Sequence, residues 1–353
     1  MLPDGRRLGA HLPLADGMVK AVERARTIGA SAIQIFSDNP TAWRRRALPP
    51  VELTAFRDRL RAYDIDPVAI HASYLVNLAG AEPSFFERSI ELLAHELHDA
   101  PSFGSRFVNV HIGSHRGSGI ARGTRRVAEG VARSLATADI LTALAGRAGG
   151  DIARTFGNDH AAGEFTGGAG GAAVVVPSAI APAMLVLENS AGSGAGLGVD
   201  LDELTAIADA IADAGIPSER VGFCLDTAHA WGAGIDVASP TAMDAFLAEF
   251  DARIGRDRLV MVHLNDSRFE RGSRMDRHEH LAAGRIGADG LANVLRHPLL
   301  AHAAYLLETP GMDAGYDAIN LARAHDLAAG RPLAPLPPGA MEVHSSRART
   351  APA

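Results

Sequence analysis

The sequence predicts an α/β protein folded as a TIM (β/α)8 barrel, and three observations support this fold class. Short apolar runs alternate with stretches of helical periodicity along the whole chain. Eight such strand–helix pairs over roughly 300 residues favour a closed barrel. Side chains with metal-binding chemistry gather where the apolar runs end, which is where barrel proteins build their sites.

The eight expected strands are short and mostly apolar, a composition typical of parallel strands covered on both faces. They are expected at residues 8–12, 32–36, 68–72, 107–112, 184–189, 221–226, 259–265 and 303–309. The helices that follow them are expected at residues 15–28, 51–63, 83–99, 121–144, 202–214, 241–254, 288–296 and 317–328. An open doubly wound sheet is the competing topology. It normally carries a glycine-rich phosphate turn after its first strand, and Gly9-Ala-His-Leu-Pro-Leu lacks that pattern.

Two segments depart from the alternation. Residues 145–181 are rich in glycine and alanine and lie where a barrel needs only a few residues, so we expect a flexible surface insertion away from the site. A short extra hairpin at residues 173–177 is the alternative. Residues 331–353 contain a proline-rich run and are expected to form a disordered or draped C-terminal tail. Residues 1–330 therefore form the single predicted domain.

Composition limits the class of protein. Of 353 residues, 47% are apolar, which is enough for a large core. There is no apolar run of about 18 residues and no apolar segment at the start of the chain, so neither a membrane span nor a secretory signal is expected. The single cysteine, Cys224, lies in an apolar run and fits a reducing cytoplasm. The net charge of −7 does not suggest a nucleic-acid partner, but it does not exclude one, because a local basic patch can dominate at the binding face. A monomer is the default expectation.

Nine side chains of the kinds that bind metals lie at or just after the C-terminal ends of the expected strands. They are His71, His111, Glu188, Asp226, His229, His263, Asp276, His278 and Glu308. In a parallel barrel these strand ends share one mouth, so the nine side chains should converge there. Four carboxylates and five imidazoles exceed the needs of one ion and indicate a cluster, with zinc as the metal that suits the ligands best.

Each of these residues taken singly has an ordinary explanation. A lone histidine at a strand end is more often structural or exposed than a ligand, and residues 268–277 also read as a solvated charged loop. Glu188 and Glu308 are harder to explain, because each closes an apolar run and a buried carboxylate is unfavourable without a cation. The joint pattern is therefore the stronger argument.

Seven motifs together resemble the endonuclease IV family, the zinc-dependent apurinic/apyrimidinic endonucleases of base-excision repair. They are Leu8-Gly-Ala-His11, His71-Ala-Ser-Tyr-Leu-Val-Asn-Leu78, Leu187-Glu-Asn-Ser-Ala-Gly192, Leu225-Asp-Thr-Ala-His-Ala-Trp231, His263-Leu-Asn-Asp266, Gly272-Ser-Arg-Met-Asp-Arg-His278 and Leu307-Glu-Thr309. The resemblance runs from about residue 7 to about residue 328 and is interrupted by the expected insertion.

The resemblance implies three zinc ions per chain at the C-terminal face of the barrel. By analogy, one ion is held by His71, His111 and Glu188; a second by Glu188, Asp226, His263 and Glu308; and a third by His229, Asp276 and His278. It implies zinc-assisted hydrolysis of the phosphodiester bond 5′ to an abasic site in duplex DNA, leaving a 3′-hydroxyl and a 5′-deoxyribose phosphate. Glu308, which would orient the attacking water, and the bridging Glu188 are the predicted catalytic residues.

The resemblance also implies DNA contacts from loops around the site. The predicted DNA-binding residues are Asn39, Trp43, Arg44, Tyr74, Leu75 and Arg277. Tyr74 and Leu75 match a loop that enters the duplex, although residues 74–76 also read as the start of a core segment. Thr41 and Ile112 depart from the family pattern, where a long polar residue and a proline are usual.

Two other functions remain open from the sequence. A single-metal sugar isomerase or epimerase of the xylose-isomerase-like barrels would need only Glu188, Asp226, His263 and Glu308, and it would leave His71, His111, Asp276 and His278 without a role. A DNA-lesion binding protein without catalysis is the non-enzymatic alternative.

Overall fold

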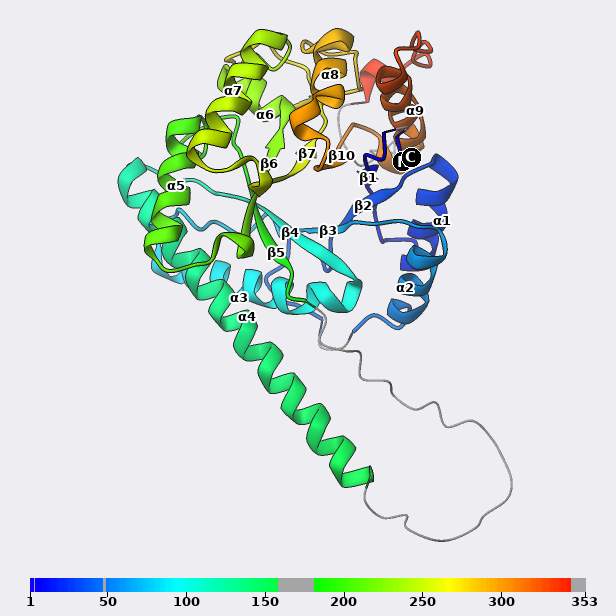
Figure 1. Ribbon diagram of the computed structural model, residues 1–353. Helices are drawn as coiled ribbons and strands as arrows, with labels where there is room; N and C mark the ends of the chain where they lie inside the picture. The colour runs from blue at the N-terminus through cyan, green and yellow to red at the C-terminus, as the bar shows by residue number, and fades with distance from the viewer. Residues whose placement is uncertain (3, 47–48, 158–180, 344–353) are drawn as a thin grey trace, which may run out of the picture.

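The computed structural model describes residues 1–2, 4–46, 49–157 and 181–343. Eight parallel strands close into a barrel in the order β1-β10-β7-β6-β5-β4-β3-β2, with the helices outside it (Figure 1). The barrel strands are β1 (Leu8–His11), β2 (Ala32–Ile35), β3 (Val68–His71), β4 (Ser105–His111), β5 (Met184–Glu188), β6 (Val221–Asp226), β7 (Leu259–His263) and β10 (Ala304–Leu307). The predicted TIM-barrel fold is confirmed.

Helices connect and cover the strands. They are α1 (Met18–Ile28), α2 (Leu53–Ala62), α3 (Pro83–Asp99), α4 (Ile120–Gly157), α5 (Leu201–Asp213), α6 (Thr227–Ala233), α7 (Pro240–Arg253), α8 (Gly287–Arg296) and α9 (Tyr316–Ala329). Short 3-10 helices lie at Ala100–Phe103, Ser218–Arg220, Arg256–Arg258, Pro298–Leu300, Met312–Ala314 and Ala340–Glu342. None of the helices in the described ranges is long and apolar enough to cross a membrane.

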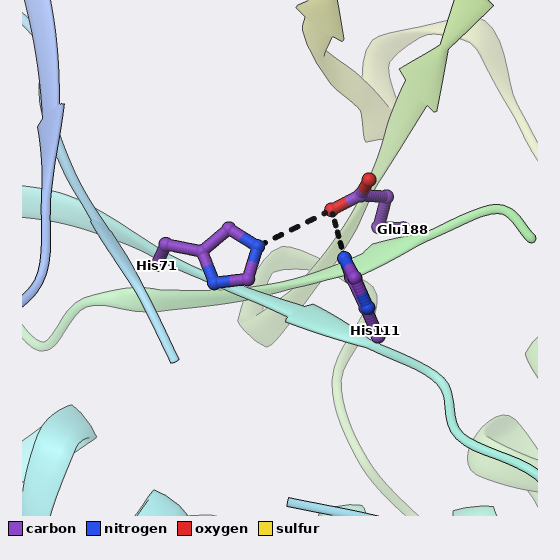
Figure 2. Close-up of side chains that lie close together, drawn as sticks. All are labelled: His71, His111 and Glu188. Atoms are coloured by element: carbon purple, nitrogen blue, oxygen red, sulfur yellow. Dashed lines mark ion pairs between the residues drawn. The ribbon is translucent and has the colours of Figure 1, made fainter. Parts of the chain in front are cut away.

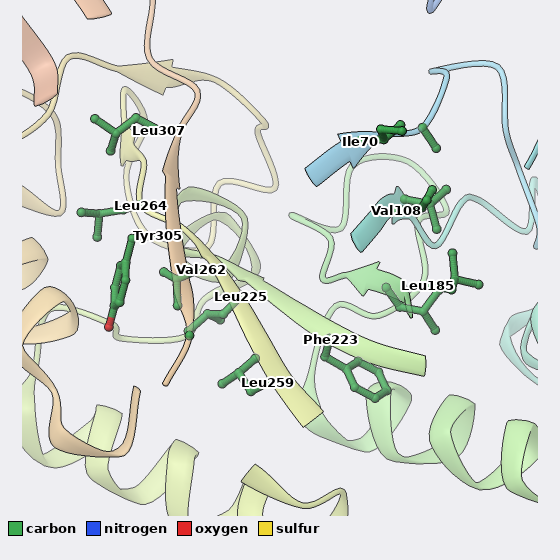
Figure 3. Close-up of a cluster of buried hydrophobic side chains, with 14 of the residues drawn as sticks. Ile70, Val108, Leu185, Phe223, Leu225, Leu259, Val262, Leu264, Tyr305 and Leu307 are labelled. Atoms are coloured by element: carbon green, nitrogen blue, oxygen red, sulfur yellow. The ribbon is translucent and has the colours of Figure 1, made fainter. Parts of the chain in front are cut away.

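Strand side chains alternate between the inside of the barrel and the layer beneath the helices. Ile70, Leu185, Phe223, Val262 and Tyr305 belong to the large core between strands and helices (Figure 3). The strand residues one position away form a second, interior cluster: Ala32, Ala69, Phe107, Val186, Cys224, Met261 and Leu306. Because side chains alternate along a strand, the residue two positions after an interior one also points into the barrel, nearer its C-terminal mouth.

The close approach of β1 to β2 depends on a glycine. A Cβ atom on Gly9 would lie 1.7 Å from the carbonyl oxygen of Ala32. Only glycine leaves room for the two strands to pair at this point.

The expected insertion begins as helix rather than as irregular chain. Helix α4 was expected to end at residue 144, but its backbone stays helical to Gly157 and leaves the barrel surface (Figure 1). Alanine, leucine and arginine between the glycines are strong helix formers, and each glycine costs only about 1 kcal/mol. The rest of the expected insertion, at 158–180, lies outside the described residues.

Residues 331–343 are ordered and lie against the barrel, so for this part of the C-terminal tail the draped alternative fits and the disordered one is wrong. Leu333 packs against the core, and Ala340 is buried. The Ala340 carbonyl accepts a hydrogen bond from His280 Nε2 at 2.9 Å, and the Ala334 carbonyl accepts one from Arg323. Buried donors on the barrel therefore hold the segment in place, while residues 344–353 lie outside the described part of the chain.

Candidate metal centre

The ligand residues at the barrel mouth continue the alternation that points every second strand residue into the barrel. Two residues after the interior Ala69, Val186, Cys224 and Met261 come His71, Glu188, Asp226 and His263, and Glu308 follows the interior Leu306 in the same way. The first four of these ligands each end a strand, and all four are buried. The barrel therefore brings these ligand types together because of strand register rather than loop conformation.

A first group consists of His71, His111 and Glu188 (Figure 2). Glu188 Oε2 lies 3.8 Å from His71 Nε2 and 3.6 Å from His111 Nε2. Ligand atoms that share an ion at about 2.0–2.2 Å are separated by comparable distances.

A second group shares Glu188 with the first and adds Asp226, His263 and Glu308. His263 Nδ1 lies 3.4 Å from Glu188 Oε1, 3.3 Å from Glu308 Oε2 and 3.9 Å from Asp226 Oδ2. One imidazole nitrogen therefore faces three carboxylates.

A third group differs slightly from the expected set. Asp226 lies with His229 and His278 here, and its Oδ2 is 3.5 Å from His278 Nε2. Asp276 Oδ1 is also adjacent, 3.2 Å from His229 Nε2 and 3.6 Å from His278 Nε2. The expected Asp276 is thus present, and Asp226 links this group to the second. A two-stranded hairpin of β8 (Asp266–Ser267) and β9 (His278–Glu279) positions the loop that carries Asp276 and His278.

Four of the imidazoles have one nitrogen engaged by a protein acceptor. The Nδ1 atoms of His71, His229 and His278 lie 2.7–3.0 Å from the carbonyl oxygens of Ala72, Asn189 and Glu308. His263 uses its other nitrogen: Nε2 lies 3.1 Å from Gln34 Oε1. In each ring the opposite nitrogen faces the carboxylates, so a cation bound between them would complete the arrangement of metal-binding histidines.

Buried ligand atoms without hydrogen-bond partners show that these residues fit metal ions. Among the described residues, Glu188 Oε1, His263 Nδ1 and His278 Nε2 are buried and have no such partner. Unsatisfied buried polar atoms are rare and unfavourable. All three face other ligand atoms, so cations between them would satisfy the whole set.

The electrostatics of the cluster indicate the same need for positive charge. Burial lowers the pKa of His71 to about 4, so this imidazole is neutral at neutral pH. Burial opposes protonation of His229 as well, yet Asp226 and Asp276 raise its pKa well above the usual value. Burial would raise the pKa of Glu188, but the imidazoles of His263 and His111 hold it well below the usual value. Glu188 therefore remains charged although it is buried, which favours cations nearby.

Sequence reasoning missed the amides that orient the ligands. Gln34 Nε2 donates to Glu308 Oε1 at 2.6 Å, Asn109 Nδ2 donates to Glu188 Oε2 at 2.6 Å, and Asn265 Nδ2 donates to Asp226 Oδ2 at 2.7 Å. All three amides are fully buried. Each of these amides is a polar residue within or directly after an apolar strand, and this pattern in the sequence could have indicated them.

The predicted DNA-binding residues are placed unequally. Asn39, Tyr74 and Arg277 line a cavity of about 810 Å³ above the cluster, and Tyr74 is 59% exposed. Leu75 is half-buried against the core. Trp43 packs edge-on against Phe85, 5.7 Å between ring centres, and lines a different cavity.

Several arginines near these loops form ion pairs with carboxylates. Arg45 pairs with Asp99 at 2.5 Å, whereas the neighbouring Arg44 is exposed. In the loop that carries Asp276, Arg268 and Arg271 pair with Glu279 and Asp236.

Comparisons with known proteins agree with the fold and the site. Residues 22–329 match the family model of the xylose isomerase-like TIM barrel. A protein from Methanoculleus marisnigri described as a probable endonuclease 4 is 36% identical over 321 residues, covering 91% of this chain and 98% of its own length. The crystal structure of endonuclease IV from Thermus thermophilus is 35% identical, with a TM-score of 0.69, and the match covers 92% of this chain and 99% of that one.

The fold and the ligand cluster first place the protein among the xylose isomerase-like TIM barrels that carry metal-binding side chains at the barrel mouth. The sequence identities narrow this class, and the chain belongs to the endonuclease IV family. The resemblance read from the motifs is thereby confirmed. An L-ribulose 3-epimerase structure, 14% identical with a TM-score of 0.55 over 92% of this chain, shares the fold alone.

Proposed function

We propose that the protein is a zinc-dependent nuclease of DNA repair that hydrolyses the phosphodiester bond 5′ to abasic sites in duplex DNA. The products are a 3′-hydroxyl and a 5′-deoxyribose phosphate, and three zinc ions are bound per chain. The observation that carries the proposal is the set of three ligand groups joined by Glu188 and Asp226. A sugar isomerase needs only one of these groups.

When bound, the zinc ions supply Lewis acidity that lowers the pKa of water and neutralises charge on phosphate oxygens. The chain supplies the remaining requirements. Glu308 Oε1 is held by Gln34, and Oε2 faces His263, so the carboxylate is fixed at the floor of the larger cavity. From there Glu308 orients the attacking water.

The larger cavity fits a nucleotide turned out of the duplex. Its volume is about 810 Å³, and its wall includes the aromatic rings of Phe36 and Tyr74, which meet edge-on at 5.1 Å. The exposed Tyr74 stands at the rim, where it can occupy the space that the abasic nucleotide leaves.

The test combines metal content with incision. Protein dialysed against metal-free buffer is analysed for zinc, and it is then incubated with a duplex containing one abasic site and with the intact duplex. We expect about three zinc ions per chain, incision of the abasic duplex alone, and a 3′ end that a DNA polymerase extends.

Glu308→Gln is the matched variant, since it keeps the shape of the side chain and removes its charge. We expect it to fold normally and to lose activity by about 10²-fold or more. One manganese or magnesium ion per chain, with no incision of either duplex, would refute the proposal in favour of a sugar isomerase.

A further inference from the structure

A second cavity, of about 280 Å³, opens beside the metal cluster. The two cavities share His71, Tyr74, His111, His229 and Asp276. Beyond these residues the larger cavity lies over the loops after β1, β2, β7 and β10, whereas the smaller lies over the loops after β3, β4 and β5. The cluster therefore lies where the two cavities meet, and a polymer that crosses the cluster contacts both cavities.

The lining of the smaller cavity suits a phosphate group. Apart from the cluster residues, the polar side chains that line the smaller cavity carry hydroxyl groups, amide groups and one guanidinium group. They include Ser73, Asn77, Ser114, Arg116, Ser190 and Ser193. Within the described lining the only carboxylates are the cluster residues Glu188 and Asp276. Neutral donors together with a guanidinium are the groups that bind DNA phosphates.

The loop that carries Arg116 is fixed from both sides. Asn77 Nδ2 donates to the Ser114 carbonyl at 3.1 Å, and Ser114 N donates to Asn77 Oδ1 at 3.0 Å. On the other side, His115 N donates to the Ala195 carbonyl at 2.9 Å. Arg116 thus extends from a loop that needs no rearrangement before it binds.

His115 has a structural part in this loop. Its Nδ1 accepts hydrogen bonds from Gly117 N at 3.2 Å and Gly119 N at 3.0 Å, which closes the turn after Arg116. The histidine that accompanies His111 in the sequence therefore shapes the loop and is not in any of the three ligand groups.

Two more arginines continue from this cavity along the start of α4. Arg122 and Arg125 are three residues apart, so they lie on one side of the helix, and both are exposed. Gly123 and Val127 form the buried side. Because α4 follows β4, its first turns lie at the mouth end of the barrel.

Within the described ranges, these three arginines differ from most other surface arginines in their lack of ion pairs. In the part of the chain that the structure describes, the guanidinium groups of Arg116, Arg122 and Arg125 form no hydrogen bond and no ion pair. By contrast, arginines elsewhere contact carboxylates at 2.5–3.2 Å: Arg59, Arg61, Arg133, Arg253 and Arg285. A chain of net charge −7 needs such a local basic path to bind DNA.

We propose that the smaller cavity and the start of α4 form a phosphate path, defined by Arg116, Arg122 and Arg125, for the DNA strand that crosses the metal centre. Arg116 binds the backbone phosphate next to the scissile one, and Arg122 and Arg125 bind the phosphates that follow. This proposal rests on the proposed nuclease function and adds the side of the metal centre on which the flanking phosphates are bound.

The test compares Arg116→Ser and Arg122→Ser/Arg125→Ser with a charge-matched control, Arg61→Ser/Arg106→Ser. Arg61 lies in the last turn of α2 and Arg106 at the start of β4, so both lie at the opposite end of the barrel. Binding of abasic and intact duplexes is measured as a function of salt, together with KM, kcat, zinc content and hydrolysis of bis(p-nitrophenyl) phosphate, which has no flanking strand.

We expect Arg116→Ser to lower the slope of log affinity against log salt by about 1, the double variant to lower it by about 2, and KM for abasic duplex to rise roughly three- to tenfold. Zinc content and the small-substrate rate should stay at wild-type values. A neutral methylphosphonate at the neighbouring phosphate on one side of the lesion should abolish the effect of Arg116→Ser.

Wild-type salt slopes in the Arg116 and Arg122/Arg125 variants, or an equal loss in the control, would overturn the phosphate path. So would the absence of coupling to a methylphosphonate on either side. If the wild type binds duplex through these arginines but does not incise it, the nuclease proposal fails while the phosphate path stands as a DNA-binding surface.

Discussion

At the scale of single residues, the most informative feature is how each ligand is aimed. His263 directs Nδ1 into the cluster because its Nε2 is engaged by Gln34, and the same amide donates to Glu308. Gln34 is fully buried and comes from β2, which contributes none of the nine predicted ligands. One amide thus orients two ligands of the second group.

Gln34→Leu should weaken metal binding while the barrel stays folded. The change keeps side-chain volume but frees His263 and Glu308 to turn, and loss of such an orienting partner typically lowers metal affinity 10–100-fold. Zinc retained after dialysis at graded free zinc concentrations measures the effect, with circular dichroism to confirm the fold. Wild-type affinity at all sites would show that Gln34 only fills space.

At the scale of elements, helix α3 holds the two loops predicted to contact DNA. Glu96 of α3 accepts a hydrogen bond from Ser73 N at 3.2 Å, and Ser73 Oγ donates to the Pro40 carbonyl at 2.7 Å. Burial raises the pKa of Glu96 to about 8, an effect that Arg45, 3.8 Å away, only partly offsets. Glu96 is therefore mostly protonated at neutral pH.

This pKa predicts how stability depends on pH. The folded value of about 8 lies above the ordinary value of 4.5, so the contribution of Glu96 is fully present below pH 4.5 and is lost as pH rises through 8. Glu96→Gln keeps the neutral form at every pH. Between pH 6 and pH 8.5 the wild type should therefore lose about 2 kcal/mol more unfolding free energy than the variant.

Urea unfolding at the two pH values measures the difference. Glu91→Gln is the control, because Glu91 is an exposed residue of the same helix. Equal losses in wild type and Glu96→Gln would mean that Glu96 is ionised in the folded protein.

The C-terminal segment 331–343 is a second element that supports the metal site. His280, whose Nε2 bonds to the Ala340 carbonyl, lies two residues after the ligand His278. Its ring packs against that of Tyr316, with 4.9 Å between ring centres and a tilt of 35°. On the other side, Val343 lies so close to Gly311 that a Cβ atom there would be 2.9 Å from it. The segment thus packs behind the loops that carry His278 and Glu308.

Truncation separates the two parts of the tail. Removing residues 331–353 should lower the unfolding free energy by about 2–4 kcal/mol, since buried donors lose acceptors and apolar surface is exposed. It should also reduce zinc content at the third group. Removing only residues 344–353 is the control and should leave both properties unchanged; equal melting temperatures for the two truncations would contradict a supporting role for 331–343.

At the scale of the whole molecule, the barrel concentrates negative charge that metal ions must balance. The cluster gathers four carboxylates, which are part of the chain's net charge of −7, at one place in the barrel. Ligands that bind the folded state alone stabilise it in proportion to the logarithm of their concentration. Stability and metal occupancy are therefore linked in this protein.

Chelation should destabilise the protein as well as inactivate it. We expect the melting temperature to fall by roughly 10 °C on exhaustive dialysis against chelator and to recover when zinc is restored. Differential scanning calorimetry at matched ionic strength measures the shift, and zinc is determined in the same samples. An unchanged melting temperature after complete zinc removal would show that the cluster does not contribute to folding stability.

The sequence by itself determined the barrel and the side chains at its mouth. Both follow from local rules: apolar runs of strand length alternate with helices, and a residue two positions beyond an interior one must also face inward. His71, Glu188 and Asp226 could be read in this way because each closes an apolar run. Family motifs added the expected chemistry, and the family assignment agrees with them.

Only the tertiary structure decided how these residues work together. The place of Asp226 between two ligand groups, the choice of Nδ1 in His263 and the amides behind the carboxylates depend on the register of strands far apart in the chain. The helical start of the expected insertion and the packing of residues 331–343 also escaped the sequence, because glycine and proline content reports local propensity. Buried partners such as His280 override that propensity only once the barrel has closed.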